Sequence, residues 1–269
     1  MKASSGALSL QDWFGRIGVR FVDFAAYIGG ISLLLGQTIG WLVAVPQRRP
    51  PLRVHFWRIG LSSLPIVFLT AFFTGMVLAL QSAYQMQKIG AEIYIASLVA
   101  LSMTRELGPV LTALVIAGRV GASITAELGT MKVTEQIDAL QALATDPVKY
   151  LVVPRFIALV TMLPLLTSYA DFSGIIGGYV IGVYKLGLGS TLYWRMTFDP
   201  LVLKDVATGL IKAVAFAAII AIVACYEGFR TEGGAEGVGR ATTLSVVMSF
   251  ILIVAADCLL TAMFYFLFR

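Results

Sequence analysis

Ionisable side chains inside long apolar runs are the residues of this sequence that could carry chemistry. Arg105 and Glu106 stand next to each other in one such run, and Asp171, Lys212 and Asp257 each interrupt another. A charged side chain left alone at the centre of a bilayer costs about 2.5–3.5 kcal/mol, so such residues pair with one another or face a polar cavity. The pattern predicts a membrane charge network, and two uses of it stay open: lining a substrate path, or locking helices together through ion pairs.

The spacing of these charges favours different roles for them. Arg105 and Glu106 are adjacent, so they cannot pair across one helix face as residues three or four apart do. We therefore interpret them as functional. For Lys212 with Asp257 we favour an ion pair that stabilises two helices. Asp171 is left open between a position near the middle of the membrane and a surface that faces a partner.

The composition places these residues in a membrane protein. Of the 269 residues, 58% are hydrophobic and only 13% are charged, whereas a soluble domain has roughly 25% charged residues. The net charge of +5 does not indicate a nucleic-acid partner, because the basic residues gather between the apolar runs, as they do in membrane proteins. We therefore expect an all-α integral membrane protein.

Five apolar runs are long enough to cross a bilayer, which takes about 20 mostly apolar residues. An earlier stretch, Phe21 to Val45, is weakened by glycines and could either span or lie in the interface as a bent helix. The sequence thus predicts an N-terminal interfacial helical region over residues 1–58 and a five-span membrane domain over residues 59–269. The predicted spans are Ile59–Gln87, Ile93–Gly118, Phe156–Tyr184, Val206–Tyr226 and Ala241–Phe268.

The distribution of lysine and arginine predicts the orientation of the spans. Thirteen of these residues lie in the N-terminal part, in the loop between the second and third spans, or in the loop before the last span. Five lie on the opposite side. Because positively charged loops stay in the cytoplasm, we expect a cytoplasmic N-terminus and a cytoplasmic loop between the second and third spans.

That loop contains the best candidate for a docking element, a polar helix over about residues 130–144. Its apolar residues fall on one helical face, and its polar side is partly acidic. A helix of this kind can dock into a groove on a partner protein. The alternative, a helix lying on lipid, is disfavoured because such helices are rich in lysine and arginine. The residues of the apolar face are Val133, Ile137, Leu140 and Ala144.

Two other patterns admit both a structural and a functional interpretation. A bulky apolar patch from Phe72 to Gln81, which includes Leu78, could hold acyl chains, although core packing is the more common use. Small residues recur every four positions from Ala113 to Thr125 and from Gly174 to Gly182, so helix backbones can approach closely there. Packing within one subunit is favoured over packing across a homodimer.

The sequence lacks the motifs of an enzyme that acts alone. It has no G-x-x-x-x-G-K-[ST] loop for a nucleotide and no G-x-S-x-G nucleophile elbow. One histidine and two distant cysteines exclude an ordinary zinc site. An ion-coupled secondary transporter that uses the membrane charges as a relay stays an alternative, although no internal repeat supports it. A membrane scaffold is another alternative.

One long segment resembles the signature of a known family. RELGPVLTALVIAGRVGASITAELGTMKVTEQIDAL, from Arg105 to Leu140, is followed by DPVKYLVVPR, from Asp146 to Arg155. Together they resemble the MlaE (YrbE-type) permeases, the membrane subunits of ABC lipid transporters linked to MCE-domain proteins. TGMVLALQ at Thr74–Gln81, GLIKAVAF around Lys212 and GRATT at Gly239–Thr243 extend the resemblance.

The resemblance implies an assembly and a task. It implies a homodimer of permeases in the bacterial inner membrane, two ABC ATPase subunits, an MCE-domain periplasmic protein and, in some systems, a STAS-domain protein. The substrate would be phospholipid moved between the inner and outer membranes, which maintains outer-membrane lipid asymmetry. The chain would bind no cofactor itself, since ATP and Mg are used by the partner ATPase.

The resemblance also implies roles for individual residues. The segment at about 130–144 would be a cytoplasmic coupling helix that touches the ATPase, and the charges of two later spans would form pairs that transmit or stabilise the transport states. The residues implied are Leu78, Gln81, Arg105, Glu106 and Leu107 for lipid binding and gating, Glu135, Ile137, Asp138 and Leu140 for ATPase coupling, and Lys212 and Asp257 for the charged pairs, with Asp171 as a further membrane charge.

Overall fold

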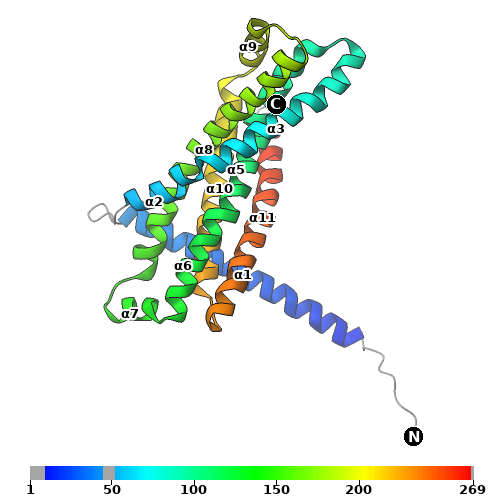
Figure 1. Ribbon diagram of the computed structural model, residues 1–269. Helices are drawn as coiled ribbons and strands as arrows, with labels where there is room; N and C mark the ends of the chain where they lie inside the picture. Colours follow the sequence, from blue (N-terminus) through cyan, green and yellow to red (C-terminus); the bar gives the residue numbers. More distant parts are fainter. Residues whose placement is uncertain (1–9, 45–51, 268–269) are drawn as a thin grey trace.

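The protein is a bundle of long helices (Figure 1). The computed structural model describes residues 10–44 and 52–267, and in these ranges it contains no strand. Parts of the predicted N-terminal region, residues 1–9 and 45–51, lie outside the described residues, as do residues 268–269. The helices are α1 (Leu10–Ala44), α2 (Leu52–Ile59), α3 (Leu64–Met86), α4 (Ile95–Ser102), α5 (Gly108–Ile116), α6 (Ala122–Val133), α7 (Gln136–Ala142), α8 (Val153–Tyr179), α9 (Ser190–Phe198), α10 (Leu203–Phe229) and α11 (Gly234–Leu267).

Several of these helices are segments of longer ones. Single π-helical turns at Met103–Leu107 and Ala117–Gly121 join α4, α5 and α6 end to end. Further π-helical turns flank α8, at Val148–Val152 and Val180–Lys185. A π-helical turn inserts an extra residue and shifts the direction of the side chains that follow, and such turns are frequent at functional sites.

Six helical segments are long and apolar enough to cross a membrane. Five of them match the five predicted spans, the last up to Leu267, since Phe268 lies outside the described residues: Leu52–Ile89, Glu92–Val133, Val148–Lys185, Leu203–Phe229 and Gly234–Leu267. The all-α integral membrane fold is thus confirmed. The sixth segment, Ala25–Val43, is the stretch that the sequence left open between spanning and lying in the interface, and its length and composition permit a crossing.

The core forms where α8 and α10 pack against α3, α5 and α6. Gly75 of α3 lies directly against the backbone of α8 at Gly174, so any side chain at position 75 would overlap the Gly174 carbonyl. On α6, the Thr125 hydroxyl is 3.0 Å from the Ala224 carbonyl oxygen and 2.8 Å from Ser245 Oγ. Both stripes of small residues therefore serve packing within this chain.

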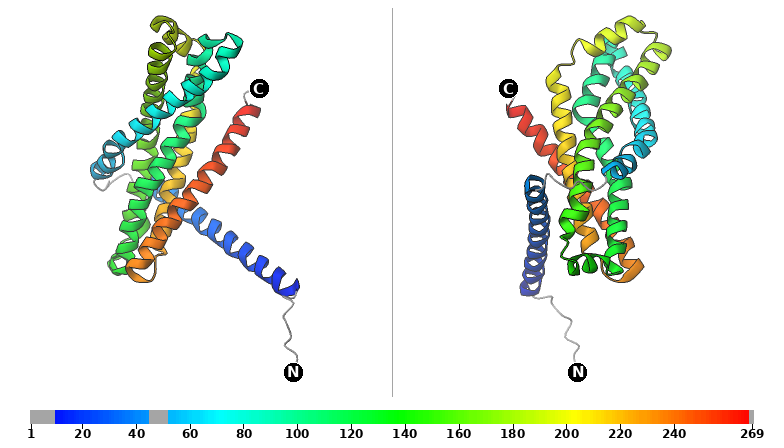
Figure 2. Two further views of the ribbon diagram at one scale, coloured as in Figure 1. Left: turned by 45° about the vertical axis from the view of Figure 1, so that its right-hand side comes forward. Right: turned by 90° about the vertical axis from the view of Figure 1, so that its left-hand side faces the viewer.

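Figures 1 and 2 both show that the two ends of the bundle differ. One end carries α7 and the turn between α10 and α11, and the other carries α9. α1 extends obliquely away from the bundle and contacts it mainly through α8, α10 and the turn before α8. Tyr27 of α1 packs edge-on against Tyr226 of α10, with ring centroids 5.4 Å apart.

The predicted single helix over residues 130–144 is broken in two. α6 continues to Val133, the chain turns at Thr134 and Glu135, and α7 follows as a separate helix of seven residues. Glu135 has a left-handed backbone, with φ at 59°, which no α-helix can contain. The hydrophobic period runs through this turn unchanged, so the sequence pattern carried no signal for the break.

Candidate functional site

Arg105 and Glu106 lie in the π-helical turn Met103–Leu107, between α4 and α5. Pro109 follows in the first turn of α5, and proline has no N–H to donate to the carbonyl of Arg105, four residues earlier. The ammonium of Lys212 donates to that carbonyl instead, at 3.2 Å. The local backbone thus provides an acceptor for a lysine from α10 as well as directing two charges into the bundle.

Lys212 is the centre of a buried ionic cluster. Its side chain is only 2% exposed, and its Nζ lies 2.5 Å from Glu106 Oε2 and 2.9 Å from Asp257 Oδ1 on α11. Nζ also donates to the hydroxyl of Thr261 at 2.6 Å, and that hydroxyl in turn donates to Glu106 Oε1 at 3.2 Å. One lysine therefore connects three helical segments, and the attraction of the two carboxylates offsets part of the cost of burying its charge.

Arg105 pairs with Asp205, a residue that the sequence analysis did not single out. The guanidinium contacts Asp205 Oδ1 through Nε at 2.8 Å and through Nη2 at 2.7 Å. The other carboxylate oxygen of Asp205 accepts the backbone N–H of Val202 at 3.2 Å, which caps α10. Asp205 is thereby fixed by its own helix, while half of the Arg105 side chain stays exposed.

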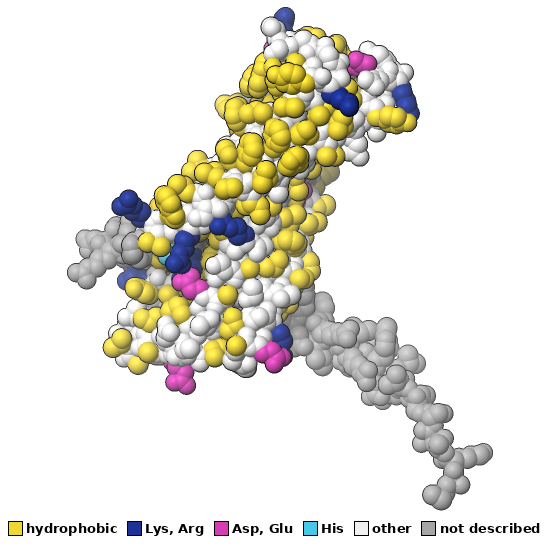
Figure 3. All heavy atoms as spheres, in the orientation of Figure 1, with side chains coloured by type: hydrophobic (Ala, Val, Ile, Leu, Met, Phe, Trp, Pro, Cys, Tyr) yellow, Lys and Arg dark blue, Asp and Glu magenta, His cyan; other side chains and the backbone are white. Residues whose placement is uncertain are grey.

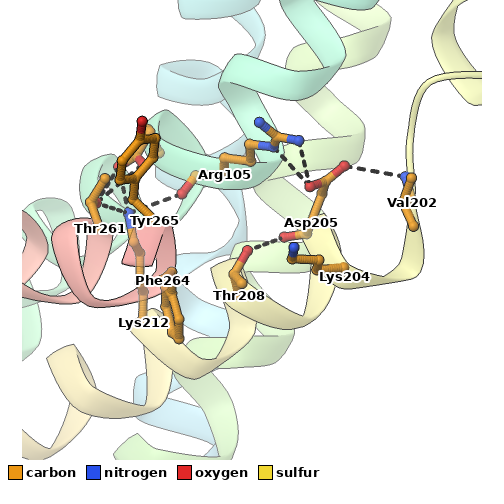
Figure 4. A pocket seen from close by; sticks show the side chains of 10 residues that line it. Arg105, Val202, Lys204, Asp205, Thr208, Lys212, Thr261, Phe264 and Tyr265 are labelled. Carbon is orange, nitrogen blue, oxygen red and sulfur yellow. Dashed lines mark hydrogen bonds and ion pairs between the residues drawn. The ribbon is translucent and has the colours of Figure 1, made fainter. Parts of the chain in front are cut away.

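A pocket of about 450 Å³ lies beside these ion pairs (Figure 4). Its lining combines three cations, Arg105, Lys204 and Lys212, with the carboxylates of Glu106 and Asp205, and Asp257 adds a third carboxylate beside Lys212, so opposite charges balance around the pocket. The side chains of α11 add an aromatic wall. The other lining residues are Val202, Thr208, Thr261, Phe264 and Tyr265.

The pocket lies toward the α9 end of the bundle, at the start of α10 and near the end of α11. Arg105 is fourteen residues from Arg119 along the continuous helical run Glu92–Val133, which corresponds to about 20 Å at 1.5 Å per residue. A hydrocarbon core is about 30 Å thick. The pocket is thus separated from the α7 end of the bundle by most of a membrane, and it suits a ligand with both charged and apolar parts.

Comparison with known proteins identifies the family. The family model described as "Permease MlaE" matches residues 53–263. A Rickettsia felis protein named as an ABC transporter permease is 48% identical over 249 residues, which cover 93% of this chain and 96% of that protein. A Synechocystis protein, also named as an ABC transporter permease, is 45% identical over 253 residues, 94% of this chain and 92% of its own.

The chain belongs to the MlaE permease family. A third relative, from Haemophilus influenzae, is named the intermembrane phospholipid transport system permease protein MlaE. It is 36% identical over 260 residues, 95% of this chain and 98% of that protein. The matched region 53–263 starts in α2 and runs into α11. It includes every residue that lines the pocket except Phe264 and Tyr265, which form the aromatic wall.

This MlaE permease brings together most of the membrane charges singled out in the sequence. Arg105, Glu106, Lys212 and Asp257 all belong to the connected cluster or its pocket. Asp171 does not: it is buried in α8 beside Gly108, and it forms no ion pair with any residue that the structure describes. No contact in the described part of the chain joins Asp171 to Lys212 or Asp257, so the structure does not support a common network of the three.

The three uncharged residues assigned to lipid binding lie outside this pocket. Leu78 is half-buried on α3 and packs against the core, and Leu107 does the same beside the π-helical turn. Gln81 is exposed near the α9 end of α3. Asp205 follows directly on a polar connection and resembles a loop residue in the sequence. Sequence reasoning missed seven lining residues: Val202, Lys204, Asp205, Thr208, Thr261, Phe264 and Tyr265.

At the α7 end of the permease, the coupling residues divide into two groups. Ile137 is buried and Leu140 packs against the core, so these two hold α7 to the bundle. Glu135 and Asp138 are exposed. Asp138 pairs with Lys132 of α6 at 2.9 Å, which braces the turn between the two helices.

Proposed function

We propose that this permease is the membrane subunit of an ABC transporter that moves phospholipid between the inner and outer membranes of a bacterial envelope. The observation that carries the proposal is the pocket at Arg105, which combines a half-exposed arginine with an aromatic wall between apolar helices. A transporter of this kind supports outer-membrane lipid asymmetry. The Haemophilus influenzae relative is named for intermembrane phospholipid transport, which supports the same substrate class.

The pocket suits a phospholipid head group better than a small ion. Arg105 is bound to Asp205 on one side, and its side chain is half exposed, so its guanidinium can donate charge-assisted hydrogen bonds to a phosphate. Phe264 and Tyr265 offer apolar contact beside it. About 450 Å³ accommodates a head group and the start of the acyl chains, and the chains themselves would continue along apolar helix surfaces.

We infer that two copies of the chain face each other through α11. Few residues of this helix are buried within the chain, although it is apolar along most of its length. Large exposed apolar faces mark sites of protein contact or lipid contact. A second copy on this face would enclose the pocket, because α11 supplies its aromatic wall. The exposed apolar residues include Leu244, Val247, Phe250, Ile251 and Val254.

The ATPase would dock at the α7 end, with Glu135 and Asp138 as the accessible contacts. This chain would bind no nucleotide, and ATP and Mg would be used by the partner. An MCE-domain protein would sit at the α9 end, in the periplasm, and the N-terminus would lie in the cytoplasm of a bacterial inner-membrane complex. A STAS-domain protein bound to the ATPase would complete the assembly.

Transport follows from a difference in lipid affinity between two states. Closure of the ATPase dimer would push on α7, which is fixed to the bundle through Ile137, and α6 continues from there as one helical run to the π-helical turn at Arg105. A shift of this run would change the distance between Glu106 and Lys212. The lipid would then be released or taken up because the two states bind it with different affinity.

Native mass spectrometry of the complex, extracted gently from its own membrane, tests the proposal. Two copies of this chain with two copies of an ATPase and retained phospholipid are expected. A chain that carries no ATPase, and whose flux responds to a proton or sodium gradient, would instead assign it to the ion-coupled class.

A further inference from the structure

A second group of basic side chains surrounds a smaller pocket near the α7 side of the membrane. We name it the α2 pocket; it has a volume of about 350 Å³ and lies between α2, α6 and α8. The face drawn in Figure 3 shows basic, histidine and acidic side chains gathered beside α2, with hydrophobic side chains above them. The residues used below are His55, Arg58, Ser62, Arg119, Glu127 and Arg155.

The α2 pocket has more positive charge than its own acidic residue can neutralise. It is lined by three guanidinium groups and one carboxylate, that of Glu127. Glu127 pairs with Arg155 at 2.9 Å and lies 4.0 Å from Arg58. Arg119 donates to the neutral hydroxyl of Ser63 at 2.5 Å and has no acidic partner among the described residues. Two positive charges are therefore left over in one partly enclosed space.

Arg155 adds an unused donor to this excess of charge. The residue is only 4% exposed, which is rare for arginine. Its Nη1 donates to the Leu151 carbonyl at 2.6 Å, and its Nη2 faces Glu127. Its Nε has no hydrogen-bond partner in the described part of the chain. Buried donors are almost always satisfied, so an unpaired one at a pocket wall indicates a missing acceptor.

The surroundings of the α2 pocket indicate where the acceptor comes from. Trp57, next to Arg58, is 63% exposed, as expected for tryptophan at a membrane–water interface. Leu61, Ile66 and Leu69 continue an exposed apolar surface from there along the start of α3. An anion bound by the guanidinium groups would thus have apolar surface directly beside it.

We propose that the α2 pocket binds the phosphate of an anionic lipid head group from the leaflet on the α7 side. Arginine binds phosphate through paired hydrogen bonds, and basic pockets between spanning helices at the cytoplasmic side are suited to anionic lipid head groups. Arg119 and Arg58 supply the unmatched charge, Arg155 the unused donor and Ser62 a hydroxyl. This site is separate from the pocket at Arg105 and does not depend on what that pocket transports. A free phosphate ion shares the same chemistry, and the test separates the two.

The test measures lipid retained by the purified full-length complex in detergent. Dioctanoyl phosphatidylglycerol is titrated into wild type, Arg119→Gln and Arg58→Gln, and bound lipid is counted by native mass spectrometry. We expect wild type to retain one more lipid per chain than Arg119→Gln does, and at least a tenfold weaker affinity at that site in the variant. The side chain of Arg58 is 68% exposed, so Arg58→Gln is expected to fold normally. It is also expected to bind the lipid more weakly than wild type does, which separates a loss of binding from a folding defect.

Lys88→Gln is the matched control, because it removes an exposed cation at the opposite end of α3. It is expected to bind phosphatidylglycerol as wild type does, and Arg105→Gln is expected to keep the lipid at the α2 pocket. Equal retention by wild type, Arg119→Gln and Arg58→Gln would overturn the proposal. Displacement of the lipid by millimolar inorganic phosphate would overturn the lipid assignment in favour of a free anion, and equal affinity for dioctanoyl phosphatidylcholine would overturn the requirement for an anionic lipid.

Discussion

Lys212→Met is the substitution whose effect the structure defines most closely. It keeps the volume of the side chain and removes the only cation that faces both Glu106 and Asp257 in the cluster. Breaking a buried ion pair by deleting one partner typically costs about 3–5 kcal/mol, because the other charge stays buried and unpaired. Glu106 and Asp257 are 41% and 24% exposed, so water partly compensates them, and we expect the lower end, about 3 kcal/mol.

A loss of that size is measurable as a shift in unfolding temperature. For a chain of this length 1 kcal/mol corresponds to about 2–4 °C, so about 3 kcal/mol predicts a drop of about 6–12 °C for the purified protein in detergent. Lys185→Met, which removes an exposed lysine, serves as the control and is expected to stay within about 2 °C.

A compensated variant separates the loss of pairing from the loss of packing. Combining Lys212→Met with Glu106→Gln and Asp257→Asn removes the unpaired charges, so most of the lost stability is expected to return. Two results would refute the reasoning: a drop below about 2 °C for Lys212→Met alone, or a triple variant as unstable as the single one. Either would mean that water or an ion neutralises the carboxylates.

Three other substitutions probe the rest of the account. Asp205→Asn should reduce lipid transport strongly while it lowers stability by only about 1 kcal/mol, since its partner Arg105 is half exposed; transport and unfolding assays on one sample separate the two. Gly75→Val should lower the free energy of unfolding by about 3 kcal/mol or more, because it forces α3 and α8 apart. Its control Gly36→Val places the new side chain in open space and should cost less than about 1 kcal/mol. Equal yields of the two folded variants would contradict the packing of α3 against α8. Asp138→Arg on α7 should weaken co-purification of the ATPase while it lowers the unfolding temperature by less than about 4 °C, since the exposed pair with Lys132 is worth at most about 1 kcal/mol; unchanged co-purification would place the ATPase elsewhere.

The helices and their membrane character could be predicted from the sequence, because apolar runs of about 20 residues have few alternatives. The need for Arg105 and Glu106 to find partners on other helices followed from the same physics. Their partners did not follow, since Asp205 stands at the edge of a polar connection and its role depends on how α10 is capped. Pairing between helices distant in sequence is a property of the packing.

The break at Glu135 shows a second limit of the sequence. A positive φ is common at glycine and asparagine, and glutamate gives no such signal. The turn is held by Ile137, which anchors α7 to the core, and by the Lys132–Asp138 ion pair. The sequence placed apolar residues on the correct face, but the structure uses two of them to attach the helix to its own bundle.

We propose that ATP hydrolysis on a partner drives phospholipid movement through the pocket at Arg105. The most direct measurement reconstitutes the complete complex in liposomes and follows a fluorescent phospholipid with ATP, without ATP, and with the Glu106→Gln variant. We expect transport that requires ATP and that falls at least tenfold in Glu106→Gln, while the ATPase still binds to the variant. Transport that is unchanged in Glu106→Gln, or that follows a proton or sodium gradient without ATP, would contradict it.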